Sequence, residues 1–294
     1  MSAIDVHTHG RAERALRLVL TLNASYMVVE FVAGALSGSL ALLSDAGHML
    51  SDVGAVTIAL IASHISRRSA SRGQTYGYGR AEVLAALING LILWLLVGAI
   101  FLEAIKRLFS PPEIPSQVVL GVGAAGLALN IAGVFVLFRH RGENLNLRGA
   151  FLHVAADSLG SVGVIVAAFL MLQFKLYIAD PLVSFGIGAL ILCSSSWLIK
   201  ESVHILLEGT PRHVSVERIR SDLQALEGIE RCHDLHIWLI GSGEPVLTAH
   251  LDASPNADRT KLLREATEML ARNHNIRHVT IQLETEPLPD SPHC

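Results

Sequence analysis

Residues 82–107 read EVLAALINGLILWLLVGAIFLEAIKR, a stretch whose charged side chains stand only near its two ends. An α-helix rises about 1.5 Å per residue, so about 20 apolar residues are enough to cross the roughly 30 Å hydrocarbon layer of a membrane. This stretch therefore predicts a membrane-spanning helix. Five other stretches give the same prediction. The six expected spans cover residues 16–36, 40–63, 82–107, 116–138, 149–173 and 180–205.

The charged residues are distributed unevenly along the chain. They make up 17% of the 294 residues, against roughly 25% in soluble domains. Of the 49 charged residues, 26 lie in residues 1–207 and 23 in residues 208–294. This excludes a simple soluble enzyme, and a net charge of −3 without a basic stripe excludes nucleic acid as a partner. Three cysteines cannot form a disulfide framework, and we expect no cleavable signal in residues 1–17.

The composition divides the chain into three expected parts. They are a cytoplasmic segment (1–15), a six-helix transmembrane domain (16–207) and a cytoplasmic domain (208–294). In the last part we expect helices over 215–227 and 258–273 and strands over 232–240, 245–253 and 278–284. This αββαβ order predicts a small α+β, ferredoxin-like sandwich with both helices on one face of the sheet.

Lys and Arg in short loops predict the orientation in the membrane, because they favour the cytoplasmic side. They gather before the first expected span, after the second and after the fourth. These residues are Arg11, Arg14, Arg17, Arg67, Arg68, Arg72, Arg80, Arg139, Arg141 and Arg148. We therefore expect a multi-pass protein of the cell (inner) membrane with both termini in the cytoplasm.

The second and fifth expected spans each carry an HxxxD motif, His48 to Asp52 and His153 to Asp157. Four residues of helix advance by about 400° and about 6 Å, so each His and its Asp point the same way, one turn apart. Two such helices facing each other supply two imidazole nitrogens and two carboxylate oxygens, a set that suits tetrahedral zinc. One motif alone could be a His–Asp pair that links helices. Two of them, both in the middle of the membrane, predict a metal site.

Charge supports this prediction. Two neutral histidines and two aspartates cancel the charge of a divalent cation, and protons compete for the same groups when the metal is absent. Asp45 shares the face of His48; it could accept a hydrogen bond from that ring or line the path into the site. Other buried polar stripes, Asn23 with Glu30 and Glu82 with Asn89, favour interhelical hydrogen bonds, with a proton relay as the alternative.

A second metal site is expected in the C-terminal domain. His233 and His250 lie on neighbouring strands, and Glu284 ends the last strand. The three could meet at one edge of the sheet, although a pair of surface histidines also arises by chance. The terminal residues His7, His9, His293 and Cys294 could bind metal as well, and their role stays open.

The whole chain resembles the cation diffusion facilitator family. The resemblance rests on the two HxxxD motifs, on SLALLSDAGHMLSD (39–52) and YGYGRAE (76–82), and on LHIW (235–238) and TIQLE (280–284) in the tail. His at position 48 resembles the zinc-transporting branch, which can also carry cadmium. The loop before the third span departs from the family pattern, because its stretch Tyr76-Gly77-Tyr78-Gly79 has no His.

This resemblance implies a homodimeric transporter that exports zinc in exchange for protons by alternating access. It implies that His48, Asp52, His153 and Asp157 form the transport site. It also implies a regulatory Zn²⁺ at His233, His250 and Glu284, in a domain that resembles a metallochaperone. Arg80 is implied to pair with an acid near Glu208 as a hinge between the membrane and cytoplasmic parts.

Two other classes of protein place His and Asp in membrane helices. An intramembrane zinc hydrolase keeps one coordination position open for water, whereas four protein ligands close the shell, and no HExxH or GxSxG motif is present. A membrane-bound zinc sensor would bind zinc at the tail without moving it across the bilayer. We therefore expect a secondary transporter rather than an enzyme, with the sensor as the alternative.

Overall fold

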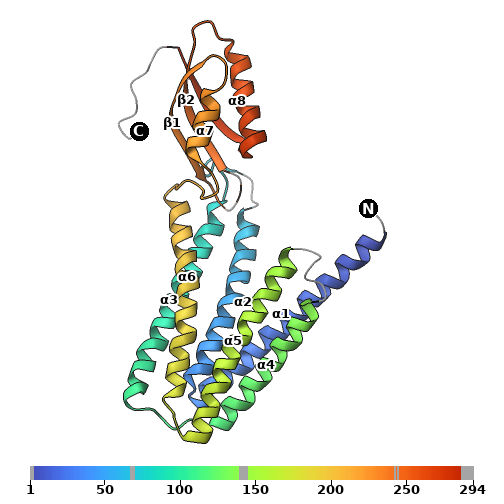
Figure 1. Ribbon diagram of the computed structural model, residues 1–294, viewed down its shortest axis with the longest axis vertical. Coiled ribbons are helices and arrows are strands. Elements are labelled where there is room, and N and C mark those ends of the chain that lie inside the picture. Colours follow the sequence, from blue (N-terminus) through green and yellow to red (C-terminus); the bar gives the residue numbers. More distant parts are fainter. Residues whose placement is uncertain (1–2, 67–69, 139–144, 242, 244, 286–294) are drawn as a thin grey trace. The chain divides into compact units, whose positions relative to one another are not determined.

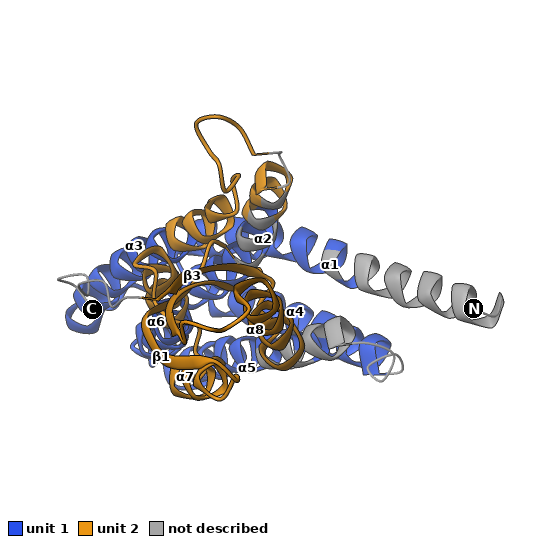
Figure 2. Cartoon of the chain, turned by 90° about the horizontal axis from the view of Figure 1, so that it is seen from above, with its two compact units in different colours: residues 1–57, 89–196 blue, residues 58–88, 197–294 orange. Residues whose placement is uncertain are grey.

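A computed structural model describes residues 3–66, 70–138, 145–241, 243 and 245–285. Within its helices, the side chains of residues 3–18, 20, 52, 55–56, 59, 63, 145–150, 152–153 and 155–156 lie outside the description. The chain forms two compact units, residues 1–57 with 89–196 and residues 58–88 with 197–294 (Figure 2).

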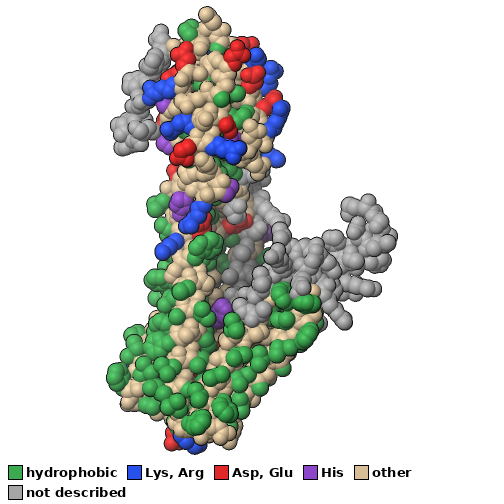
Figure 3. Space-filling model, viewed as in Figure 1, with side chains coloured by type: hydrophobic (Ala, Val, Ile, Leu, Met, Phe, Trp, Pro, Cys, Tyr) green, Lys and Arg blue, Asp and Glu red, His purple; other side chains and the backbone are tan. Residues whose placement is uncertain are grey.

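Six long helices correspond to the six predicted spans (Figure 1). They are α1 (Ala3–Ser37), α2 (Leu40–Ser66), α3 (Arg80–Phe109), α4 (Ser116–Phe138), α5 (Leu145–Phe174) and α6 (Ala179–Leu206). Among the described residues, α3, α4, α6 and the part of α5 from Asp157 onward are long and apolar enough to cross a membrane. Their outward faces carry large apolar side chains, such as Leu95 at 76% exposure and Phe135 at 69%. Hydrophobic side chains cover these helices in Figure 3, as contact with lipid requires.

A turn of two residues separates α1 from α2, because Gly38 adopts a left-handed conformation with φ of 72°. The first amides of α2 are capped from α6. The buried Asp180 carboxylate accepts hydrogen bonds from Ser39 Oγ at 2.5 Å, from the Leu40 amide at 2.7 Å and from the Ala41 amide at 3.2 Å. Arg107 of α3 donates to the carbonyl of Gly38. Side chains from two other helices thus fix the start of α2.

Close packing in the first unit depends on glycines of α4. A Cβ atom at Gly126 would overlap the ring of Tyr26 from α1, and one at Gly123 would lie 3.0 Å from Val164 of α5. Small residues let membrane helices approach closely, which increases their van der Waals contact. The main core of this unit contains Leu42, Leu93, Val97, Val119, Val164, Met171 and Ile191.

The C-terminal part of the second unit has the predicted αββαβ order. Its elements are α7 (Val216–Gln224), β1 (Ile229–Leu239), β2 (Pro245–Ala253), α8 (Arg259–His274) and β3 (His278–Glu284). The strand order is β1-β2-β3, with β1 antiparallel and β3 parallel to β2. Both helices pack on one face of the sheet, where Ile219, Leu223, Ile237, Leu247, Leu251, Ala266 and Leu270 are buried.

Two predicted boundaries in this domain were wrong. The first helix ends at Gln224 instead of 227, and β1 begins at Ile229 instead of 232. Gly228, with φ of 97°, makes a turn that ends the helical region early and starts the strand. Both helices begin at capping side chains, because Ser215 accepts from the Arg218 amide and Asp258 from the amides of Thr260 and Lys261.

Candidate metal centres

The predicted intramembrane site lies between α2 and α5. His48 Nε2 of α2 stands 3.7 Å from Asp157 Oδ1 of α5. Asp157 is 6% exposed, whereas the His48 side chain is 30% exposed. The other two predicted ligands, Asp52 and His153, belong to the same helices, but their side chains lie outside the described residues. The structure thus brings one imidazole and one carboxylate, from different HxxxD motifs, to the same place.

Asp45 lies one helical turn before His48 and is 3% exposed. It faces Gly160 of α5, where a Cβ atom would lie only 2.5 Å from Asp45 Oδ1. The missing side chain at position 160 is therefore what lets a carboxyl group enter between the two helices. Whether Asp45 orients His48 or lines the path of the ion stays a prediction.

Polar side chains form hydrogen bonds between helices at two described points, one of which belongs to a predicted polar stripe. Ser66 Oγ of α2 donates to Glu82 Oε1 of α3 at 2.7 Å, as the pattern of Glu82 predicted. Asn130 of α4 donates to Ser161 of α5 at 3.3 Å. The second bond was not predicted, because one polar residue in an apolar stretch gives no sign of its partner.

The predicted ligands of the C-terminal domain come together. His233 of β1 and His250 of β2 are directly paired in the antiparallel register, and β3 brings Glu284 beside β2. His250 Nδ1 lies 2.8 Å from Glu284 Oε1, and His233 Nε2 lies 3.6 Å from Glu284 Oε2. One nitrogen or oxygen from each residue lies within 4.8 Å of the other two. Nitrogen and carboxylate donors at such distances can hold a Zn²⁺ ion.

Two aspartates beside this cluster were not predicted as part of it. Asp252 Oδ1 lies 3.3 Å from His233 Nε2, and Asp234 Oδ2 lies 3.5 Å from His250 Nε2. Asp234 adopts a left-handed φ of 47°, where the β1–β2 register is irregular. Its position depends on this irregularity, which the sequence does not reveal. Asp252 follows His250 by two residues and so shares its face of the strand, a signal that could have found it.

Cys232 precedes His233 but does not join the cluster. It is 5% exposed and belongs to the apolar core on the opposite side of the strand. Burial raises the pKa of the Cys232 thiol above its usual value, and nearby Arg220 lowers it to a lesser extent. Since the thiolate is the form that binds metal, a protonated thiol makes Cys232 a poor ligand at neutral pH.

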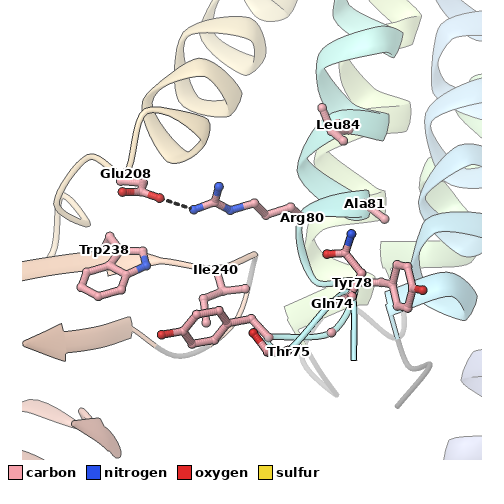
Figure 4. A pocket seen from close by; sticks show the side chains of 12 residues that line it. Gln74, Thr75, Tyr78, Arg80, Ala81, Leu84, Glu208, Trp238 and Ile240 are labelled. Carbon is pink, nitrogen blue, oxygen red and sulfur yellow. Dashed lines mark hydrogen bonds and ion pairs between the residues drawn. The ribbon is translucent and has the colours of Figure 1, made fainter. Parts of the chain in front are cut away.

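Arg80 and Glu208 meet at the start of α3 and the end of α6 (Figure 4). Arg80 Nη2 donates to Glu208 Oε1 at 2.7 Å in a cavity of about 460 Å³. The cavity is also lined by Gly73–Tyr78 and by Trp238 and Ile240 of the C-terminal domain. Both charged side chains are more than 40% exposed, so this pair contributes at most about 1 kcal/mol to stability.

Comparison with known proteins decides the family. The cation efflux transmembrane domain model matches residues 16–207, and the model of the cation efflux protein cytoplasmic domain matches residues 211–286. The chain belongs to the cation diffusion facilitator family. Membership in this family makes it a multi-pass membrane transporter for the efflux of metal cations, and not an enzyme.

Several relatives of this facilitator are similar over nearly the whole chain. The cadmium, cobalt and zinc/H(+)-K(+) antiporter of Bacillus subtilis is 41% identical, with 95% of this chain and 91% of the antiporter covered. The zinc transporter ZitB of Escherichia coli is 38% identical, with 93% and 88% covered. The metal-bound C-terminal domain of the CzcD transporter from Cupriavidus metallidurans is 36% identical over 24% of this chain and 99% of its own, with a TM-score of 0.24.

Proposed function

We propose that this facilitator exports divalent metal ions, zinc foremost and cadmium as well, in exchange for protons across the inner membrane. His48, Asp52, His153 and Asp157 hold the ion in transit, and alternating access opens their site first to the cytoplasm and then to the outside. The approach of His48 to the buried Asp157, at 3.7 Å, is the observation that carries this proposal. The names of the relatives, a zinc transporter and a metal/proton antiporter, support the choice of ions.

The chemistry of the four ligands explains why metal and protons would exchange. Two neutral imidazoles and two carboxylates cancel the charge of a divalent cation, so the loaded site is formally neutral in a medium of low dielectric constant. Protons bind the same nitrogens and oxygens and thereby displace the metal. A proton gradient directed inward therefore drives metal outward when the cytoplasmic side loads first.

We further propose that residues 1–15, 16–207 and 208–294 are the cytoplasmic segment, the transport domain and the cytoplasmic domain of a homodimer. His233, His250 and Glu284 would bind a regulatory Zn²⁺. The burial of His233 and Glu284 and the 2.8 Å contact between His250 and Glu284 support this assignment. The Arg80–Glu208 pair would act as the hinge contact between the transport and cytoplasmic domains.

Zinc flux into sealed proteoliposomes under an imposed pH gradient tests the transport site. His48→Ala and Asp157→Asn should lose flux, because each removes one ligand from the shell. His64→Ala is the matched control, since His64 is an exposed histidine on the same helix. Flux that persists in Asp157→Asn would contradict the site. Wild-type protein that binds zinc without any flux would instead favour the sensor.

A further inference from the structure

A second polar cluster of the first unit is built from Tyr26 and Glu30 of α1 and Asp45 of α2. Glu30 is fully buried and Asp45 is 3% exposed. Tyr26 Oη lies 3.4 Å from Glu30 Oε1. The carboxyl group of Asp45 is close enough to that of Glu30 for the two to share a hydrogen bond. The cluster thus places two carboxyl groups in contact, one helical turn from His48.

Counting protons shows that this arrangement lacks a donor. Tyr26 has one hydroxyl hydrogen, and it goes to the carbonyl oxygen of Val122 at 2.8 Å, the nearer of its two acceptors. Glu30 Oε2 is buried and receives no hydrogen bond from the described residues. Its polar neighbour Asp45 is also only an acceptor when ionised. The two carboxyl groups can bond to each other only if one of them carries a proton.

The surrounding charges lead to the same conclusion. Among the described residues, the polar groups that face the cluster are the Tyr26 hydroxyl, the Gly126 amide and Val122 carbonyl of α4, and His48 and Asp157 near Asp45. In the described part of the chain, no Lys or Arg pairs with Glu30 or Asp45. Two ionised carboxylates in contact, shielded from water, cannot both persist. The proton is therefore part of the native arrangement.

We propose that Glu30 holds a proton that is exchanged against the metal, at a site distinct from the four metal ligands. When the metal leaves on the outer side, protons enter from that side, and one of them passes through the vacated ligands and Asp45 to Glu30, where an O–H bond forms. When metal arrives from the cytoplasm, this O–H bond breaks and the proton leaves through Asp45 to the cytoplasm, so a proton moves inward as the metal moves outward. Only O–H and N–H bonds form and break, so charge and atoms balance. This proposal rests on the proton-coupled exchange proposed above.

Glu30→Gln separates a proton-carrying role from a structural one, since Gln has the shape of Glu but cannot release a proton. Exchange of zinc for labelled zinc across the liposome membrane needs no net proton movement. We expect Glu30→Gln to keep this zinc–zinc exchange and to lose zinc uptake driven by a pH gradient by about 100-fold, the usual contribution of a proton-transfer group. Glu103→Gln is the control, because Glu103 is an exposed glutamate held by Arg107.

Infrared spectroscopy of the purified full-length protein gives a readout apart from transport. Zinc-free wild type should show the C=O band of a protonated carboxylic acid, and Glu30→Gln should lose it. A wild type without this band overturns the proposal even if the variant fails to fold. The spectrum is recorded in potassium buffer and again in choline buffer. A band that is absent in potassium and appears only in choline also overturns the proposal, because the site would then hold an alkali cation in place of the proton.

The transport results distinguish the two proposals. If wild type exchanges zinc for protons and Glu30→Gln couples equally well, the Glu30 proposal fails and the function stands. If Glu30→Gln loses zinc–zinc exchange as fully as pH-driven uptake, Glu30 is structural and the proposal also fails. If wild type moves no zinc, the proposed function itself fails.

Discussion

Asp180→Ala should destabilise the first unit strongly, because the Asp180 carboxylate caps the start of α2 from another helix. Its carboxylate accepts three hydrogen bonds, from Ser39 Oγ and the amides of Leu40 and Ala41, at 2.5–3.2 Å. Each such bond contributes about 1–1.5 kcal/mol net, and the buried donors left behind add to the cost. Removing a buried charge offsets part of the loss. We therefore expect a decrease of about 2–4 kcal/mol in the free energy of unfolding.

Thermal unfolding of the purified protein in detergent measures this effect. A loss of 2–4 kcal/mol corresponds to a fall in Tm of about 4–16 °C for a domain of this size. Asp180→Asn keeps one acceptor oxygen, so its Tm should lie between those of wild type and Asp180→Ala. Asp258→Ala removes a similar cap, with two amide bonds, at an exposed site on α8 and should cost only about 1 kcal/mol. Equal melting temperatures for wild type and Asp180→Ala would refute the reasoning.

Three further perturbations test the described sites. Gly160→Val places carbon atoms against Asp45 Oδ1 and should lower zinc flux by about 10- to 100-fold. Gly121→Val is the control, because position 121 has open space around it, and equal flux in the two variants would contradict the prediction. His250→Ala should lower the zinc bound per chain by about one ion, measured by elemental analysis, and an unchanged metal content would exclude the site. Burial raises the pKa of Cys232, so at pH 8 its thiol should be alkylated far more slowly in the folded protein than in the unfolded protein. Mass spectrometry follows the reaction, and equal rates would show that the thiol is accessible. Because the folded state keeps this proton longer, the stability that it contributes is present below the unfolded pKa and is lost as the pH rises through the folded pKa.

The helices of both units could be predicted from the sequence because their signals are local. A run of about 20 apolar residues or an apolar face repeats within one segment, and the spans and the αββαβ order followed from such patterns. The Asp180 cap could not be predicted, since its carboxylate and the amide of Leu40 lie 140 positions apart. The hydrogen bond from Tyr26 to Val122 could not be predicted either, because its two partners are also far apart in the sequence. The conformation of Asp234 depends on an irregular register that only the paired strand reveals.

The two candidate centres differ in how rigidly the backbone holds their ligands. His233 and His250 are held opposite each other by the hydrogen bonds of one sheet, and β3 fixes Glu284 beside them. Ligands on such a rigid frame can hold an ion without moving. His48 and Asp157 instead belong to two helices, and backbone hydrogen bonds within each helix leave the pair free to separate. An ion in transit must be bound tightly enough to enter and weakly enough to leave. The proposed transport site, shared between helices, would meet this need, because a small shift of α2 against α5 would open the shell while both helices stay intact.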